Sequence, residues 1–144
     1  MKLKKLITSV LLGSIIITSI PVVTFAEEIT LQNEIIAAPR LTYISAAETD
    51  LKINGTTAIV DCWVKGHAND ATKAKVIAEL QVQSSATNWI PVAIWTDTQD
   101  GYRASVYETK TINSANTYRV KSTFTVWEGS QSETIVVFSE EVTA

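Results

Sequence analysis

Residues 118–127 constrain the fold of this chain more than any other stretch, because their side chains alternate strictly in polarity. In a β-strand, successive side chains point to opposite faces, so this stretch forms a strand with one buried and one solvated face. The buried face would carry Tyr118, Val120, Ser122, Phe124 and Val126, and the solvated face Arg119, Lys121, Thr123 and Thr125. A buried strand face needs a second sheet to cover it, so the sequence predicts two packed β-sheets.

The first 26 residues have the three parts of a secretory signal peptide. Lysines at positions 2, 4 and 5 form a basic start, residues 6–20 form a mostly apolar segment that we expect to be helical, and Pro21 ends it. An uncleaved membrane anchor is the alternative, but a spanning helix needs about 20 apolar residues and this run is shorter. We therefore expect cleavage after Ala26 and a secreted mature protein that begins at Glu27.

The mature chain is mildly acidic. Its 15 acidic residues against 12 − 3 = 9 basic residues give a formal charge of 9 − 15 = −6, which disfavours non-specific binding to nucleic acid. The single cysteine, Cys62, has no partner for an internal disulfide, so the domain depends on its hydrophobic core. We expect a mature form that does not span a membrane, that has no cofactor, and whose partner is a protein or a glycan at the cell envelope.

The mature chain divides into a leader and one domain. Residues 27–39 lack clear strand or turn signals and are expected to form a flexible leader, with a short strand or a helical turn as alternatives. Residues 40–144 have the pattern of an all-β domain. Seven strands are expected, at residues 41–46 continued by 51–53, and then at 56–65, 74–83, 89–96, 102–112, 118–127 and 133–142. Residues 74–83 are also rich in helix-forming types, but their alternation outlasts a helical stripe.

Turn residues punctuate these strands. Asn54-Gly55 predicts a tight hairpin turn with positive φ at both central residues, and Asp100-Gly101 predicts another tight turn. Pro91 cannot donate to a ladder of hydrogen bonds, so the strand that contains it should be an edge strand or carry a bulge.

Alternation also predicts which side chains fill the core. It places Ala58, Val60, Cys62 and Val64 inward from one strand, and Val76, Ala78, Leu80 and Val82 inward from the next, with Gln81 outward. The expected core is built around Val60, Cys62, Val64, Val76, Leu80, Tyr118, Val120 and Phe124.

Tyr118, at the start of its strand and followed at alternate positions by Val120, Ser122 and Phe124, resembles the tyrosine corner of immunoglobulin-like and fibronectin-type-III-like domains. Cys62 stands where immunoglobulin domains place one core cysteine, but the partner position, Val120, is not a cysteine. The runs LQVQSSATNWIPVAIW and TYRVKSTFTVWEGSQSETIVVFS also resemble small secreted proteins of Gram-positive bacteria that form a domain-of-unknown-function family. Across residues 41–140, both resemblances imply an antiparallel β-sandwich, and they imply no catalytic residues.

Few residues of the chain are suited to chemistry. Nucleophilic catalysis needs a base beside the nucleophile, yet the one histidine, His67, falls in a loop and Cys62 faces inward. The segment 97–101 contains part of a calcium-loop pattern without its remaining ligands, so a turn is the better interpretation. Asn54 begins a formal glycosylation acceptor, but the hairpin turn explains these residues better.

The aromatic side chains are the remaining candidates for binding. Trp63 and Trp127 fall at outward positions, and Trp89 and Trp95 flank Pro91. Exposed tryptophans can stack on sugars or anchor a protein partner, although they also cover the rims of small sandwiches. The expected function is that of a secreted, non-enzymatic binding or surface-interaction module. A carbohydrate-binding module that uses these tryptophans and a self-associating envelope component are the alternatives.

Overall fold

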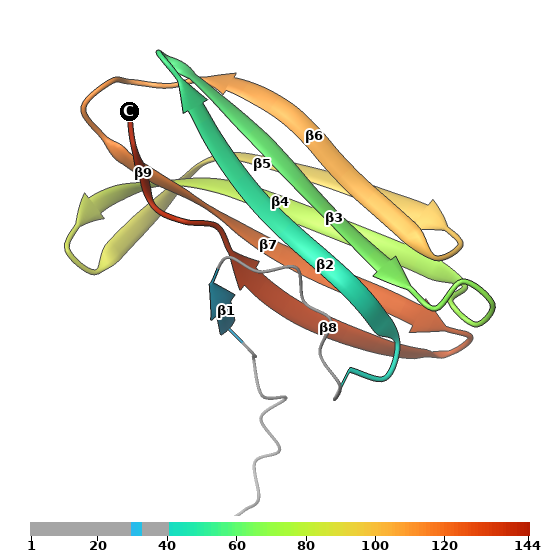
Figure 1. The fold of residues 1–144 in the computed structure, drawn as a ribbon. Coiled ribbons are helices and arrows are strands. Elements are labelled where there is room, and N and C mark those ends of the chain that lie inside the picture. Colours follow the sequence, from blue (N-terminus) through green and yellow to red (C-terminus); the bar gives the residue numbers. More distant parts are fainter. Residues whose placement is uncertain (1–29, 33–40) are drawn as a thin grey trace, which may run out of the picture.

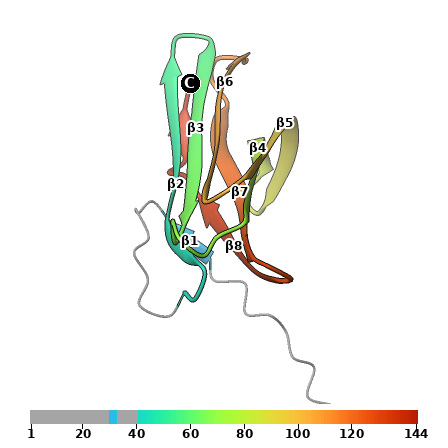
Figure 2. The same cartoon turned by 90° about the vertical axis from the view of Figure 1, so that its right-hand side faces the viewer.

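The computed structural model describes residues 30–32 and 41–144, which fold into two β-sheets packed face to face (Figures 1 and 2). Within these residues every regular element is a strand. The strands are β1 (Thr30–Gln32), β2 (Ile44–Asn54), β3 (Thr57–Gly66), β4 (Lys73–Ser85), β5 (Asn88–Asp100), β6 (Arg103–Thr111), β7 (Thr117–Glu128), β8 (Gln131–Phe138) and β9 (Val142–Thr143).

The seven long strands form one sheet in the order β2-β3-β6 and another in the order β8-β7-β4-β5, and all their pairings are antiparallel. The predicted antiparallel β-sandwich of immunoglobulin-like type is therefore confirmed. Strand β7, which contains residues 118–127, lies between β4 and β8 in the middle of the larger sheet. Strand β5 is the edge strand of the larger sheet, and β6 is the edge strand of the smaller sheet. These two edge strands lie next to each other along one side of the sandwich.

The core lies between the two sheets and consists of the side chains that alternation predicts. The eight residues expected to build it are all at most 3% exposed. Tyr118 forms the predicted corner, because its hydroxyl donates to the carbonyl of Asn113 at 3.0 Å and accepts from the N–H of Asn113 at 3.1 Å. Both bonds tie the start of β7 to the turn that precedes it.

The first and last strands differ from the prediction. Residues 44–54 form one continuous strand, because Glu48 and Asp50 lie on its outer face while the small Thr49 is buried between them. At the other end, residues 133–142 do not form a single strand. Ser139 separates β8 from β9 and forms both hydrogen bonds to Val120 of β7. Its hydroxyl accepts the N–H of Val120 at 2.8 Å, and its N–H donates to the carbonyl of Val120 at 2.9 Å.

The two predicted tight turns also differ in detail. The central residues of the β2–β3 turn are Gly55 and Thr56, because Asn54 pairs with Thr57, and only Gly55 has a positive φ, at 61°. A single glycine at the first central position is typical of a type II′ hairpin turn. Gly101 does not close a hairpin. It carries the chain from β5 in one sheet to β6 in the other.

Strands β4 and β5 confirm both expectations for Pro91. Strand β5 is the last strand of its sheet, and Val92 is a bulged residue, because Ala93 pairs with Leu80 while Pro91 pairs with Gln81. The inward prediction for β4 holds from residue 76 to residue 80, whereas Val82 is only half-buried. Gln81 was expected to face solvent, but it is 7% exposed because the side chain of Arg119 covers it.

Part of the expected leader is a strand. Thr30–Gln32 forms β1, which pairs in parallel with β8, and this is the short-strand alternative for the leader. The predicted signal peptide and the rest of the leader lie outside the described residues. Among the residues that the structure describes, there is no helix long and apolar enough to cross a membrane.

Candidate functional site: the open edge of β5 and β6

The residues most suited to nucleophilic or metal chemistry are engaged in structural roles. His67 is exposed in the loop after β3, where its carbonyl accepts hydrogen bonds from Asp70 and Ala71. Asp97 does not point into a calcium loop. Its carboxylate accepts the backbone N–H of Ser105 at 3.0 Å and thereby joins β5 to β6. No three histidine, cysteine or acidic side chains of residues 30–32 and 41–144 cluster as a metal site would require.

Cys62 is a core residue. It is fully buried, and burial is the main cause that raises the pKa of its thiol from an ordinary value of 9.0 to about 11. Across the core, the hydroxyl of Ser122 donates to the sulfur of Cys62 at 3.2 Å. Ser122 stands two residues after Val120, the position that the immunoglobulin resemblance indicates for a partner. A neutral thiol with a raised pKa is a poor nucleophile.

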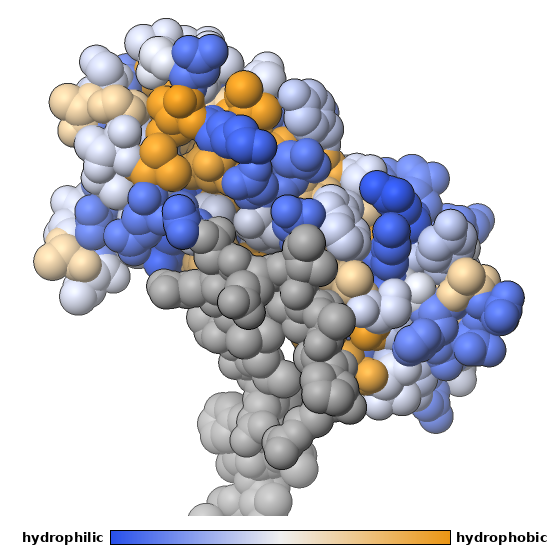
Figure 3. All heavy atoms as spheres, in the orientation of Figure 1, coloured by the Kyte–Doolittle hydropathy of each residue, from blue (hydrophilic) through white to orange (hydrophobic). Residues whose placement is uncertain are grey.

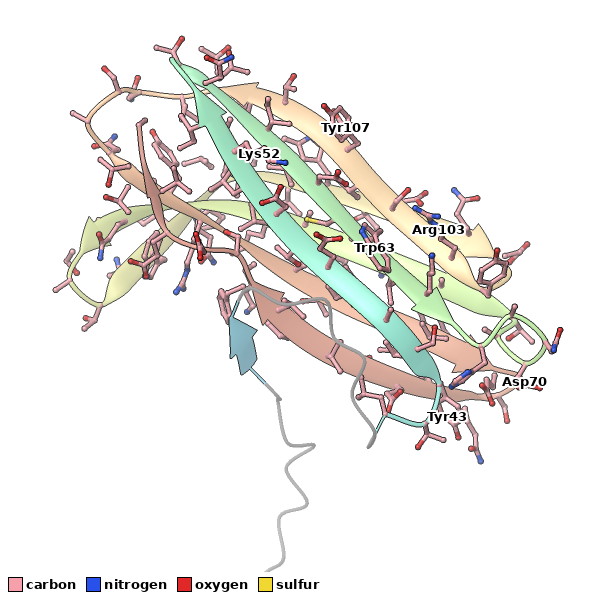
Figure 4. All side chains as sticks on the ribbon, in the orientation of Figure 1. Tyr43, Lys52, Trp63, Asp70, Arg103 and Tyr107 are labelled. Carbon is pink, nitrogen blue, oxygen red and sulfur yellow. The ribbon has the colours of Figure 1, made fainter. Side chains whose placement is uncertain are left out.

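Trp63 lies on the outer face of the smaller sheet (Figure 4). Its indole N–H donates to the carboxylate of Glu48 at 2.7 Å. Lys65 and Arg103 lie over its ring, with their charged groups 5.2 Å and 5.8 Å from the ring centre. These cation–π contacts cover part of the surface that a sugar would stack on.

Trp89 lies on the outer face of the larger sheet, where it forms a stack with Arg119 and Phe138. The guanidinium carbon of Arg119 is 4.2 Å from the centre of the Trp89 ring and 4.5 Å from the centre of the Phe138 ring. The Nε–H of Arg119 donates to the side-chain oxygen of Gln81 at 2.8 Å. Desolvation in this stack lowers the pKa of Arg119, although the residue stays charged.

The structure does not bring the four tryptophans together. Trp127 contacts Lys73, whose ammonium is 5.7 Å from the ring centre. It stands eight residues beyond Arg119 on β7, about 27 Å away at the usual rise of about 3.4 Å per residue. Trp95 packs against the core. One flat ligand therefore cannot contact Trp63, Trp89 and Trp127 at the same time.

Exposed apolar side chains gather instead along β5 and β6. Ile90, Val92 and Ile94 on β5 are 47%, 39% and 57% exposed, and Tyr102 and Tyr107 at β6 are 45% and 68% exposed. These five are all the large hydrophobic side chains that are exposed within residues 41–144. The face of the smaller sheet over β2 and β3 is different (Figure 3). Hydrophilic side chains dominate there, and apolar ones gather toward the end near β9.

A pocket opens between the two edge strands. Near the crossover, Asp97 and Ser105 close the gap between β5 and β6. Toward the bulge of β5 the gap widens into a cavity of about 200 Å³. Its walls are formed by Val92, Lys110, Thr111, Ile112, Asn113 and Tyr118. The lining of the cavity is thus mixed, with apolar side chains from Val92 and Ile112 and one ammonium group from Lys110.

Sequence reasoning missed this surface. The signal was present in the run from Ile90 to Ile94, where apolar residues are continuous around a proline that already marked an edge strand or a bulge. An edge strand with apolar side chains on both faces offers more exposed apolar area than a half-buried strand does, and periodicity alone does not show which strand occupies the edge.

Comparisons with known proteins assign neither a family nor an activity to the chain. No family model matches the chain, and no curated protein matches it. Among solved structures, the chain is similar to the solution structure of CsgH from R. palustris, at 13% sequence identity and a TM-score of 0.38, over 62% of this chain and 87% of that one. A match at this level transfers no activity. The resemblance to a secreted Gram-positive family stays a prediction.

Proposed function

We propose that this protein is an exported, non-enzymatic β-sandwich module that binds a protein partner at the cell envelope through the edge strand β5. The observation that carries the proposal is the concentration of exposed apolar side chains on the open side of the sandwich, with three of the five on β5. Three of the five lie within one short run of β5, residues 90–94, whereas soluble domains usually scatter single exposed apolar residues over their surfaces.

The backbone of β5 supports the same function. As the last strand of its sheet, β5 has one row of N–H and C=O groups that pairs with no other described strand. Pro91 and the bulge at Val92 interrupt this row, so the regular part available to an added strand is residues 93–100. Strand addition at such an edge supplies main-chain hydrogen bonds, and side chains such as Ile94 supply apolar contact.

The non-enzymatic part of the proposal is supported by what the reactive residues already do. The thiol of Cys62 is buried with a raised pKa, and the carboxylate of Asp97 holds the two sheets together. Both are engaged in the fold.

The test compares two variants of the mature protein. In Ile94→Lys, a charge replaces the most exposed apolar side chain of β5, and in the matched control Thr134→Lys, the same charge is placed at an exposed position of β8 in the same sheet. Immobilised wild type and Thr134→Lys should capture the same envelope proteins from the producing cells, and Ile94→Lys should lose them while keeping its circular dichroism spectrum.

Two results would contradict the proposal. If Ile94→Lys captures the same proteins as the wild type, β5 is not the binding element. If Trp63→Ala or Trp89→Ala abolishes binding to a glycan array while Ile94→Lys does not, the carbohydrate-binding alternative is correct. Detection of the mature protein in the culture medium tests the export part separately.

A further inference from the structure

Strand β6 has a free edge whose hydrogen-bonding groups can be assigned residue by residue. Even-numbered positions face β3, because the N–H of Ile112 donates to Thr56 at 2.8 Å and the carbonyl of Tyr102 accepts from Gly66 at 2.7 Å. Odd-numbered positions face away, as the bond from Ser105 N–H to Asp97 across the gap shows. The N–H and C=O groups of residues 107, 109 and 111 therefore point away from β3 and pair with no other described strand.

We propose that this edge, residues 107–111 of β6, pairs with the same edge of a second copy of the chain. The two β6 strands would run antiparallel about a twofold axis through Thr109, and the two three-stranded sheets would become one six-stranded sheet. In that register Tyr107 and Thr111 of opposite copies exchange hydrogen bonds, and Thr109 exchanges them with its own counterpart, for about six bonds in total. The inference does not rest on the binding role of β5, since it uses a different edge.

Charge complementarity selects this register. With the axis at Thr109, Glu108 of each copy lies directly opposite Lys110 of the other, so the interface contains two opposite-charge pairs. In the two neighbouring registers, odd-numbered residues still pair with odd-numbered residues of the second copy. One of these registers places Glu108 opposite Glu108, and the other places Lys110 opposite Lys110. Both put like charges face to face, which destabilises cross-strand pairs.

The side chains at this edge are exposed and suited to pairing. Glu108 and Lys110 are inward by alternation, yet both are exposed to solvent. On the outer face, the ring of Tyr107 extends from the edge (Figure 4) and would lie opposite Thr111 of the second copy. Aromatic and β-branched residues form favourable cross-strand pairs.

Strand β5 does not offer the same self-pairing. Its ladder is broken by Pro91 and by the bulge at Val92. Its charged residues, Asp97 and Asp100, are both acidic, so no antiparallel register of β5 with itself brings opposite charges together. The second copy is therefore assigned to β6.

A charge-swap series tests the pairing by sedimentation velocity on the mature protein between about 1 μM and about 1 mM. The wild type should form a concentration-dependent dimer. Glu108→Lys and Lys110→Glu should each weaken it by about tenfold or more, because each leaves like charges opposite each other. The double variant Glu108→Lys/Lys110→Glu should restore the dimer, since the swapped pairs are again complementary. Glu140→Lys, a matched control at an exposed position away from β6, should leave dimerisation unchanged.

A second measurement keeps the register testable if a charge variant fails to fold. In Thr109→Cys, the two introduced thiols lie at the axis, with Cα atoms about 5.5 Å apart, within the range that a disulfide spans. Mild oxidation should give a covalent dimer, whereas the control Thr125→Cys on β7 should not.

Three results would overturn the pairing. They are a wild type that stays monomeric at every concentration, a double variant that folds but does not dimerise, and a dimer that is lost in Ile94→Lys, which would assign self-association to β5.

Discussion

Removing the hydroxyl of Tyr118 tests how much the tyrosine corner contributes to the free energy of unfolding. In Tyr118→Phe the ring, which is 3% exposed, keeps its contacts, but both hydrogen bonds to the backbone of Asn113 are lost. A net contribution of about 0.5–1.5 kcal/mol for each bond gives a loss of about 1–3 kcal/mol. Tyr118 and Asn113 both line the cavity beside β5, so water reaches the freed backbone groups and limits the loss to about 1–2 kcal/mol.

Urea denaturation followed by tryptophan fluorescence measures this loss. With a slope of about 2 kcal/mol/M, the midpoint should fall by about 0.5–1 M. Tyr102→Phe is the control, because its ring is 45% exposed and the change should leave the midpoint within error. Equal midpoints for Tyr118→Phe and the wild type would show that the corner bonds contribute nothing, and the reasoning from the hydroxyl geometry would be refuted.

Three further predictions concern a buried thiol, a crowded glycine and the expected export. Cys62 should resist iodoacetamide at pH 8 in the folded protein and react at once in urea, and rapid labelling of the folded protein would contradict its burial. Because its folded pKa of about 11 lies above the ordinary 9.0, its contribution to stability should decline as the pH rises from about 9 to about 11. Gly66→Ala should destabilise the fold by about 1–3 kcal/mol, because a Cβ there would lie 2.6 Å from side-chain atoms of Ala71 and Val126. The control Gly129→Ala has open space around the new Cβ and should lose only about 1 kcal/mol from the left-handed backbone conformation. Equal losses of stability for the two variants in thermal melts would rule out crowding as the cause. Intact-mass measurement on culture medium should find a chain that begins at Glu27, and a full-length product in the membrane fraction would contradict the cleavage.

The sequence by itself determined the strands and the core. Alternation identified the inward residues of β3 and β7 one by one, because a strand that is buried on one face repeats every two residues whatever it pairs with. The resemblance to immunoglobulin-like and fibronectin-type-III-like domains placed the corner at Tyr118. The errors of the sequence prediction fell where local signals mislead: Glu48 and Asp50 look like a break, although they are the outer face of a continuous strand.

Only the tertiary structure decided where the candidate binding surface lies. Whether Ile94 is covered or exposed depends on which strand ends the sheet, and whether the tryptophans form one platform depends on the strands that carry them. Gly101 shows the same limit, since a glycine permits a turn but does not specify whether the chain returns to its own sheet or crosses to the other. Strand order is set by contacts between residues far apart in the chain, and hydrophobic periodicity, a local property, carries no information about those contacts.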